Sequence, residues 1–435
     1  MAHSKPSSDH TPTVPRALDR QRAIYLAGAA GEKPLVPIDP QALEAAARKV
    51  LSPEAFAYVA GGAGQEATIA RNRQGFARWQ IVPRMLRDVS QRDPGIELLG
   101  RKLPSPLLTC PIGALDLVHK EADLAVARAT AGLGLPMIFS NQGSVPMERC
   151  AAAMGDSPRW FQLYWSKSDD LTRSLVQRAE ACGCEAIVVT LDTTMLGWRT
   201  RDLDLAYLPF LRGRGIAQYV SDPVFQRLLD EAEAAEAQGE APPRKVNLSA
   251  LQTLWEQVSH YPGGVVETLR SGRSLAAVRT FIDLYSRPSL TWEALSWLRE
   301  QTRLPIFLKG ILHPDDARLA VLHGMSGLIV SNHGGRQVDG AIGAIEALPE
   351  VARAVAGRIP VLLDSGIRGG ADVFKALALG ATAVCVGRPY VYGLAMGGEA
   401  GVREVLLNLM SDFELTMGLA GCRQRSEITA EMLTS

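Results

Sequence analysis

One stretch of the chain places an imidazole and a guanidinium three residues apart at the end of an apolar run. The stretch SNHGGR, residues 331–336, directly follows the run GLIV. An imidazole such as that of His333 titrates near neutral pH and suits the removal of a proton from a substrate. The guanidinium of Arg336 can bind a carboxylate through paired hydrogen bonds. The two glycines let the backbone turn so that both side chains face one ligand. The alternative is a hydrogen-bonded structural histidine.

Eight short apolar or β-branched runs recur between Pro106 and Arg388, each bounded by turn residues. They lack the polar alternation of a half-exposed sheet, which indicates strands covered on both faces. The runs are PLLTCPIG (106–113), PMIFSN (136–141), RWFQLYW (159–165), AIVVTLD (186–192), PIFLKG (305–310), GLIVSN (327–332), PVLLDSG (360–366) and AVCVGRP (383–389).

Segments with the period of a helix fill most gaps between these runs. They cover residues 121–133, 169–183, 292–302, 314–324 and 370–380, and several of them close on glycine. Eight strand-then-helix units predict an α/β fold, a (β/α)8 TIM barrel; an open doubly wound sheet is the alternative.

Polar and ionisable residues gather at the C-terminal ends of the eight runs. In a (β/α)8 barrel these ends surround the mouth of the active site, so residues far apart in the sequence should converge there. The residues at these ends are Ser140, Gln162, Tyr164, Thr190, Asp192, Lys309, Ser331, His333, Asp364, Arg368 and Arg388.

The last two strand-and-helix units predict a phosphate site. Each has a glycine-containing turn with an arginine, Arg368 in the first and Arg388 in the second. Glycines let backbone N–H groups approach an anion, and a helix N-terminus favours negative charge. The alternative is that these glycines serve only the tight turns.

Three pieces lie outside the repeat. We expect residues 1–35 to be a mobile tail and residues 36–430 to form a single domain that includes an N-terminal helical extension. Residues 40–103 should close the bottom or side of the barrel. Residues 206–290, called the insertion below, interrupt the repeat after the fourth strand, and their centre is charged and broken by prolines. Such a segment on the catalytic face favours a lid with a mobile centre; a passive insertion is the alternative.

The bulk composition argues against several function classes. The 435 residues include 46 basic and 46 acidic side chains, which gives no electrostatic case for nucleic acid or an anionic membrane. No apolar stretch approaches the roughly 18 residues of a membrane span, and the polar start lacks the apolar centre of a signal peptide. The CxC pair Cys182 and Cys184 lacks the second half of a zinc site. We expect free thiols, no metal and a cytoplasmic location.

The motifs together resemble a known family. SNHGGRQ at 331–337 resembles the signature of FMN-dependent L-2-hydroxy acid oxidases and dehydrogenases. The supporting matches keep their order from about Leu43 to Ile428, and several look most like the lactate 2-monooxygenase branch. They are AYVAGGAG (57–64), CPIGA (110–114), FQLY (161–164), TLDT (190–193), GWRTRD (197–202), PFLRG (209–213), DPVFQ (222–226), LKG (308–310), HPDDAR (313–318), DSGIR (364–368) and GRP (387–389).

The resemblance implies FMN as the cofactor and assigns residues to it. Backbone beside the flavin would come from Pro111, Ile112 and Gly113. Many members have alanine at the position of Gly113, and the glycine here would widen the space beside the flavin. Ser140, Gln162, Thr190 and Ser331 would contact the isoalloxazine, and Lys309 would face its N1/O2 side, where a reduced flavin gathers negative charge. The phosphate end would be held by Asp364, Ser365, Gly366, Ile367, Arg368, Gly387 and Arg388.

The resemblance also implies the substrate and its contacts. A small L-2-hydroxy acid would be bound by Tyr58, Tyr164, Arg199 and Arg336, with Gln142 and Leu196 lining the pocket. His333 would be the catalytic base, Asp192 would orient it, and Tyr164 would donate to the substrate. Members are usually homotetramers, which we expect here too.

Four functions follow from these residues. The first is oxidation of L-lactate by dioxygen as a lactate 2-monooxygenase, giving acetate, carbon dioxide and water. The second releases the 2-keto acid and passes electrons to dioxygen, giving hydrogen peroxide, or to a quinone-type acceptor. The third is a flavin-binding scaffold without turnover, and the fourth a barrel enzyme acting on a phosphorylated substrate. The third predicts loss of His333 or an arginine, and the fourth leaves Arg199 and Arg336 unexplained.

Overall fold

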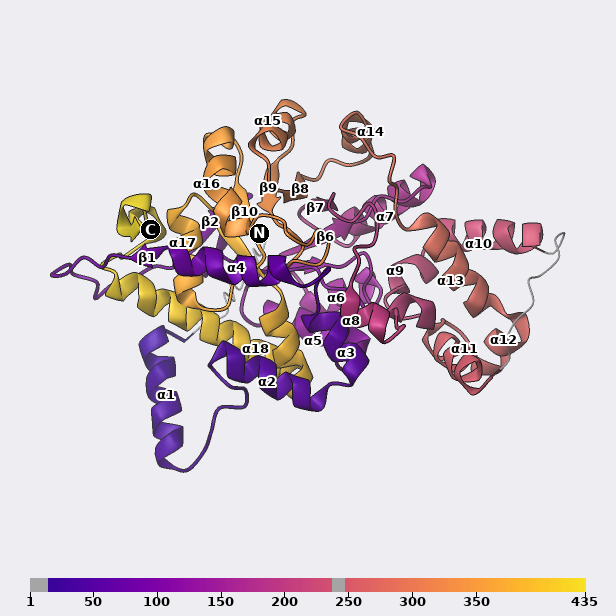
Figure 1. Cartoon of the computed structure of the whole chain (residues 1–435), viewed down its shortest axis with the longest axis horizontal. Coiled ribbons are helices and arrows are strands. Elements are labelled where there is room, and N and C mark those ends of the chain that lie inside the picture. Colours follow the sequence, from indigo (N-terminus) through magenta and orange to yellow (C-terminus); the bar gives the residue numbers. More distant parts are fainter. Residues whose placement is uncertain (1–14, 237–246) are drawn as a thin grey trace, which may run out of the picture.

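Eight parallel strands close into a barrel at the centre of the molecule (Figure 1). The computed structural model describes residues 15–236 and 247–435. The barrel confirms all eight predicted strands and excludes the open doubly wound sheet, since β11 pairs with β4. In order around the barrel, the strands are β4 (Leu107–Thr109), β5 (Met137–Phe139), β6 (Arg159–Leu163), β7 (Ile187–Thr190), β8 (Ile306–Ile311), β9 (Gly327–Val330), β10 (Val361–Leu363) and β11 (Ala383–Val386).

Successive side chains of each strand face opposite sides of the barrel wall. In β7, Val188 packs in the interior cluster, whereas Ile187 and Val189 pack under the surrounding helices. Because both sides are apolar, the strands read as continuous apolar runs. Close packing also explains Gly327, where an added Cβ would lie 2.1 Å from the ring of Phe307. The wall is therefore a fully packed support for the residues at its end.

A β-hairpin closes the N-terminal end of the barrel. Strands β2 (Ile96–Leu98) and β3 (Arg101–Leu103) pair antiparallel, directly before β4. Leu98 and Leu103 are buried and pack with the interior residues of the barrel strands. This agrees with the expectation that residues 40–103 close the bottom or side of the barrel.

Helices between the strands form the outer layer. All five predicted helical segments are present. The layer contains η1 (Leu115–Leu117), α5 (Ala122–Ala131), α6 (Met147–Met154), α7 (Asp169–Ala181), α14 (Ala294–Gln301), α15 (Pro314–Leu322), α16 (Ala344–Val355), α17 (Gly370–Ala378) and α18 (Arg388–Leu419), the last kinked at Gly397 and Gly398. Among the helices that the structure describes, none is long and apolar enough to cross a membrane.

The N-terminal extension is a series of four helices. They are α1 (Ala17–Ala29), α2 (Pro40–Val50), α3 (Pro53–Ala60) and α4 (Ala67–Arg78). Helices α2 and α3 begin with a proline behind a capping side chain, Asp39 and Ser52 respectively, as helix N-termini favour. The extension also meets the C-terminus, where β1 (Gln80–Ile81) pairs with β12 (Leu433–Thr434), after η3 (Arg425–Glu427) and η4 (Ala430–Met432).

Helix α1 differs from the tail that the sequence predicts over residues 1–35. Arg20 binds Glu404 at 2.9 Å and Asn408 at 2.5 Å, both in α18. Ala17 is buried, and its N–H donates to Glu414. Residues 17–29 are thus a helix anchored on α18, and residues 1–14 of the predicted tail lie outside the described residues.

The insertion is helical and lies at one end of the molecule, at the right of Figure 1. Its described elements are η2 (Pro209–Arg212), α9 (Ala217–Val220), α10 (Pro223–Glu236), α11 (Leu248–His260), α12 (Val265–Ser271) and α13 (Arg273–Leu284), after α8 (Thr200–Asp204). Aromatic side chains anchor it, since the ring of Phe281 lies 4.8 Å from that of Tyr219 and 5.6 Å from that of Phe210. The predicted mobile centre falls largely on residues 237–246, outside the described residues, and a lid remains a prediction.

Candidate active site

A cavity opens at the C-terminal ends of the barrel strands and collects most of the residues that the sequence singles out. It reaches from the end of α3 to the turns after β10 and β11, and Gln142 and Leu196 line it as expected. The predicted site residues in its wall are Tyr58, Pro111, Ile112, Gly113, Tyr164, Arg199, Lys309, His333, Arg336, Asp364, Ser365, Gly366, Ile367, Arg368, Gly387 and Arg388.

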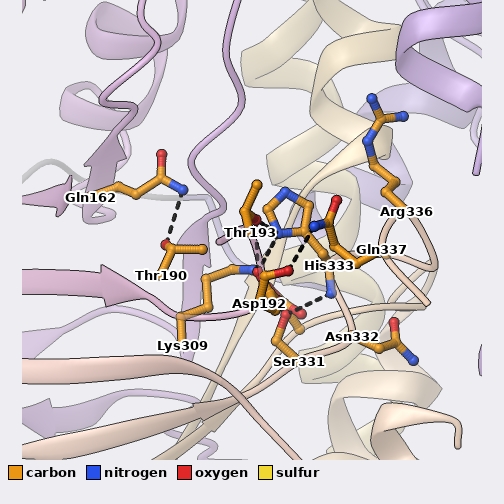
Figure 2. A network of polar contacts seen from close by, with 12 residues as sticks. Gln162, Thr190, Asp192, Thr193, Lys309, Ser331, Asn332, His333, Arg336 and Gln337 are labelled. Carbon is orange, nitrogen blue, oxygen red and sulfur yellow. Dashed lines mark hydrogen bonds and ion pairs between the residues drawn. The ribbon is translucent and has the colours of Figure 1, made fainter. Parts of the chain in front are cut away.

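The imidazole of His333 contacts the carboxylate that the sequence pairs with it (Figure 2). His333 Nδ1 lies 2.7 Å from Asp192 Oδ1 and 3.3 Å from Thr193 Oγ1. With Nδ1 bonded to the carboxylate, Nε2 is left as the ring nitrogen that can take a proton. Burial lowers the pKa of His333, while the Asp192 charge opposes this and the Lys309 charge adds to it. The imidazole is therefore neutral, and able to accept a proton, at neutral pH.

Lys309 lies between two carboxylates at the base of the cavity. Its ammonium group is 3.3 Å from Asp364 Oδ2 and 3.8 Å from Asp192 Oδ2, and it donates to Ser331 Oγ at 2.9 Å. Burial disfavours the charged lysine, but the two carboxylates outweigh burial and raise its pKa. Burial also opposes ionisation of Asp192, but the Lys309 charge, joined in acid by the charge of protonated His333, holds its pKa below the ordinary range. A fixed positive charge thus stands beneath the cavity.

The loop that carries His333 has a left-handed backbone at three successive residues. The φ angles are +57° at His333, +64° at Gly334 and +77° at Gly335. For a residue with a Cβ this conformation costs roughly 1–2 kcal/mol, so neighbouring contacts must hold it. Ser365 Oγ accepts from the Gly334 N–H at 2.9 Å, and Ser331 Oγ accepts from the His333 N–H at 3.0 Å. Gly334 and Gly335 of the signature therefore allow the left-handed turn that follows His333.

Arg336 joins this loop to the N-terminal extension. Its Nη1 donates to the carbonyls of Tyr58 at 2.6 Å and Gly61 at 2.8 Å, and its guanidinium stands 5.1 Å from the centre of the Tyr58 ring. Burial and the neighbouring Arg199 lower the pKa of Arg336 to about 9, so it stays charged at neutral pH. Burial raises the pKa of Tyr58 to about 12, so its hydroxyl keeps its proton.

Arg199 enters the same cavity from the segment after β7, which places both predicted carboxylate-binding arginines in one wall. Its Nη2 donates to Gln337 Oε1 at 3.2 Å. Gln337 in turn donates to the carbonyls of Asp192 at 2.6 Å and Met195 at 2.9 Å. Gln337 was given no role in the sequence analysis, although it is the last letter of SNHGGRQ. Figure 2 shows it beside His333 and Asp192, where it ties two rim segments together.

The two arginines expected at a phosphate are bonded differently. Arg388 donates to three main-chain carbonyls, those of Val59, Gly61 and Gly334, at 2.9–3.0 Å. Within the described residues, the side chain of Arg368 has one hydrogen bond, from Nη1 to the carbonyl of its neighbour Ile367 at 2.9 Å. Burial and the Arg388 charge lower the pKa of Arg368 to about 10. Three of the five N–H groups of the Arg388 guanidinium are thus bonded to the protein, whereas only one of those of Arg368 is.

Four of the predicted cofactor residues are buried behind the wall of the cavity. Ser140 Oγ donates to Gln162 Oε1, and Gln162 Nε2 donates to Thr190 Oγ1, both at 3.1 Å. Ser331 is buried under Lys309. The structure brings these four side chains next to the cavity and bonds them to one another or to Lys309, so their contacts to a cofactor remain a prediction.

Gly113 does not widen the cavity in the way that the sequence suggests. A Cβ added at Gly113 would lie 2.9 Å from both the Cβ and the carbonyl oxygen of Gln142. The missing Cβ therefore lets the backbone at Gln142 approach, and the expectation of extra space beside the flavin is corrected.

Two aromatic residues of the insertion complete the wall. Phe210 and Tyr285 line the cavity, and the Phe210 ring stands 6.4 Å from that of Tyr58. The sequence analysis missed both as pocket residues. The motif PFLRG, which contains Phe210, was the available signal. Across the described ranges, no group of three or more His, Cys, Asp or Glu side chains is arranged to hold a metal ion.

Comparison with known proteins agrees with this geometry. The model of the family FMN-dependent dehydrogenase matches residues 47–435. An L-lactate oxidase of Lysinibacillus sphaericus is 41% identical over 379 residues, covering 87% of this chain and 88% of that protein. Human 2-hydroxyacid oxidase 1 is 39% identical over 378 residues, covering 87% of this chain and 91% of the relative.

A solved structure also resembles the chain throughout. The crystal structure of a mandelate oxidase matches with a TM-score of 0.72 and 37% identity, covering 92% of this chain and 98% of that one.

Proposed function

The chain belongs to the FMN-dependent dehydrogenase family, and from that premise we propose that it oxidises L-lactate with dioxygen to acetate, carbon dioxide and water. The family and its relatives establish the general class of reaction: the chain is an FMN-dependent 2-hydroxy acid oxidoreductase. The proposal concerns the substrate, the residues that act on it and the fate of the product.

The cavity fits FMN by its donors and its reach. It is continuous from Lys309, near its base, to the glycine turns at Gly366 and Gly387. The Arg368 guanidinium makes one hydrogen bond to the described part of the protein, so its other donors are available at the end where a phosphate would lie. We assign Gly366–Arg368 and Gly387 to the phosphate, and Pro111 to Gly113 and Lys309 to the ring. Bound FMN supplies the acceptor for two electrons from the substrate α-carbon.

The two arginines and Tyr58 suit the carboxylate of the substrate. Arg199 and Arg336 line one side of the cavity, and each offers a planar guanidinium that can bind a carboxylate through paired hydrogen bonds. The protonated hydroxyls of Tyr58 and Tyr164 add donors for the carboxylate and the 2-hydroxyl. Held in this way, the α-carbon and its hydroxyl face His333.

His333 is the proposed base, and its contact with Asp192 is the observation that carries the mechanism. The 2.7 Å contact fixes Nδ1, so Nε2 takes the proton from the substrate. The carboxylate of Asp192 then stabilises the imidazolium that forms. Lys309 keeps a positive charge beside the cofactor site, where negative charge develops. The alternatives of an inert scaffold or a phosphorylated substrate explain neither the base nor the two arginines.

The fate of the product separates two functions in the same family. Phe210 and Tyr285 line the cavity near Tyr58, and a wall that retains pyruvate beside the oxidant would favour decarboxylation to acetate. The balanced reaction is lactate plus dioxygen to acetate, carbon dioxide and water. The second candidate, release of pyruvate with hydrogen peroxide, is favoured by the name of the lactate oxidase relative. A quinone-type acceptor is the remaining alternative.

Product analysis tests the proposal. The purified protein should be yellow, L-lactate should bleach it without oxygen, and air should then yield acetate rather than pyruvate and peroxide. Pyruvate with equimolar peroxide would assign it as an oxidase. His333→Gln should retain the flavin and lose at least ~100-fold in flavin reduction, and near-normal reduction would remove His333 from the mechanism.

A further inference from the structure

We propose that Asn72, in α4 of the N-terminal extension, is a positioning residue that sets the loop carrying His333. The inference rests on the proposed role of His333 as the base. The loop is defined as residues 331–343, between β9 and α16, and is called the catalytic loop below. Nothing in the motif SNHGGRQ points to a partner 260 residues earlier in the chain.

Asn72 and Asn332 form a reciprocal pair of amide hydrogen bonds. Asn72 Nδ2 donates to Asn332 Oδ1 at 2.9 Å, and Asn332 Nδ2 donates to Asn72 Oδ1 at 2.7 Å. Asn72 is 2% exposed and Asn332 is 6% exposed, so water does not compete for these bonds. Only a primary amide at position 72 can both donate and accept in this geometry.

The same amide also holds the far end of the catalytic loop. Asn72 Oδ1 accepts from the Ala344 N–H at 3.0 Å, at the first residue of α16. Asn332 Oδ1 accepts from the Gly335 N–H at 3.1 Å, which closes the left-handed turn around His333. One side chain from α4 therefore fixes both the entry and the exit of the loop. The direction in which the His333 ring leaves the backbone depends on that turn.

Helix α4 has separate contacts with the loop, which allows Asn72 to be tested by itself. Thr68 Oγ1 donates to the Val338 carbonyl at 2.9 Å and accepts from the Ala341 N–H at 3.0 Å. Asp339 accepts from the Gln65 N–H at 2.7 Å and the Thr68 N–H at 3.2 Å. These contacts keep α4 docked when Asn72 changes, and none of them involves the side chain of Asn332.

The test compares Asn72→Asp with Thr68→Val. Asn72→Asp keeps the acceptor for Asn332 Nδ2 and for Ala344 but sets an oxygen against Asn332 Oδ1, so the loop loses one bond beside His333. Thr68→Val removes two bonds of the same helix to the same loop at a distance from His333. The readouts are flavin content, Tm, the rate of flavin reduction by L-lactate without oxygen, and the binding of pyruvate to the oxidised enzyme.

A positioning role predicts a split between these readouts. Asn72→Asp should retain flavin and bind pyruvate normally, while flavin reduction slows by about 10- to 100-fold, the effect of a base displaced by about an ångström. Thr68→Val should lower Tm but leave the reduction rate near that of the wild type. A normal rate in Asn72→Asp, or equal falls in both variants, overturns the inference.

Two further variants close the remaining outcomes. If Asn72→Asp does not fold, Asn72→Ala is judged by the same split; failure of both to fold, with Thr68→Val folded, shows a purely structural role and overturns the proposal. Measuring His333→Gln in the same assays distinguishes failure of the proposed function from failure of the inference about Asn72. Fast reduction in His333→Gln refutes the proposed function, whereas slow reduction there with fast reduction in Asn72→Asp refutes only this inference.

Discussion

Two walls of the cavity come from outside the barrel, and they are built differently. The first wall is the N-terminal segment 58–78 against the catalytic loop, and it is joined by hydrogen bonds to the backbone. The second is the insertion, which reaches the cavity through aromatic rings and is tied to the barrel by ionised side chains. Hydrogen bonds depend strongly on direction, so the first wall is more tightly constrained than the second, whose rings pack without a fixed direction.

Buried donors and carbonyls hold the N-terminal wall. Arg336 and Arg388 together bond the carbonyls of Tyr58, Val59 and Gly61, at the C-terminal end of α3, where a helix favours positive charge. The Ala63 N–H donates to the Gly335 carbonyl at 2.9 Å. Such directional bonds leave little freedom to the loop.

A cluster of ionised groups ties the insertion wall to the barrel. Asp116, after β4, bonds Arg214 at 2.6 Å and His260 Nε2 at 3.0 Å, and Arg214 also lies 3.8 Å from Glu256. His260 belongs to α11, and its Nδ1 lies 2.6 Å from the Glu256 carbonyl. Nondirectional ring packing and partly exposed ions tolerate small shifts. We infer that the N-terminal wall holds the base His333 in place and that the insertion wall determines which sizes of substrate fit.

Breaking the N-terminal wall should have the largest effect. Arg336→Lys keeps a charge but cannot bond two carbonyls and a carboxylate together, so kcat/KM for L-lactate should fall about 100-fold. Steady-state kinetics check this, with Arg353→Lys on the exposed face of α16 as the control. Near-normal kcat/KM in Arg336→Lys would show that charge alone suffices there.

Changing the insertion wall should alter selectivity more than rate. Phe210→Leu makes room at the substrate end, so preference should move toward 2-hydroxy acids with longer side chains by about tenfold, the worth of a methylene in an apolar pocket. The ratio of kcat/KM for 2-hydroxyhexanoate to that for lactate measures it. Phe225→Leu is the matched control, because Phe225 is buried in the same aromatic cluster but does not line the cavity. An unchanged ratio would contradict the assignment.

The ionised cluster should loosen as pH rises. The hydrogen bond to Asp116 raises the pKa of His260 above 6.5, and burial and the Arg214 charge oppose this. A group whose folded pKa is raised stabilises fully below its unfolded pKa and loses that effect as pH passes through the folded value. The protection of the α11 amides against hydrogen exchange, relative to the intrinsic rate at each pH, should therefore be highest below about pH 6.5 and fall a few-fold once His260 is neutral.

A variant isolates His260 in that experiment. Burial raises the pKa of Asp123 to about 7, and its carboxylate, behind Ser144, titrates in the same window. His260→Gln should remove the pH dependence of α11 protection while Asp123 stays. A dependence that survives in His260→Gln would assign it to Asp123 or another group.

The smallest effect should come from an exposed ion pair of the N-terminal wall. Arg201 pairs with Glu66 at the surface between α8 and α4. Arg201→Ala should change the free energy of unfolding by about 1 kcal/mol or less and leave kcat unaltered, because exposed pairs contribute little. Urea titration and turnover assays measure the two quantities. A large loss of kcat would mean that surface charge, rather than backbone bonding, holds this wall.

The barrel and its rim could be predicted from local patterns. Each strand is an apolar run closed by a turn, and parallel strands gather their C-terminal ends at one edge, so His333, Asp192 and Lys309 could be grouped without coordinates. The resemblance added Tyr58 and Arg199, which lie outside the strands. Their convergence on one cavity is what the structure contributes.

The missed contacts depend on partners far along the chain. In the sequence, Asn72 is an ordinary polar residue of a helix and Asp339 an ordinary acidic residue of a loop. Their partners become visible only in the folded structure. Glu66, the residue before α4, makes no capping bond of its own, so the cap comes from a distant loop that no local pattern reveals. The bonds from the Arg388 side chain to carbonyls were missed for a related reason, since carbonyls carry no sequence signature.

The capping of α4 by Asp339 has a consequence for how the chain is made. The two partners are 271 residues apart. At roughly 5–20 residues per second, a ribosome reaches Asp339 roughly 14–54 s after it has completed Thr68. During synthesis, α4 emerges without the acid that completes its first turn, and its amide Asn72 has only water as a partner. The contacts between α4 and the catalytic loop can therefore form only after more than three quarters of the chain has been made.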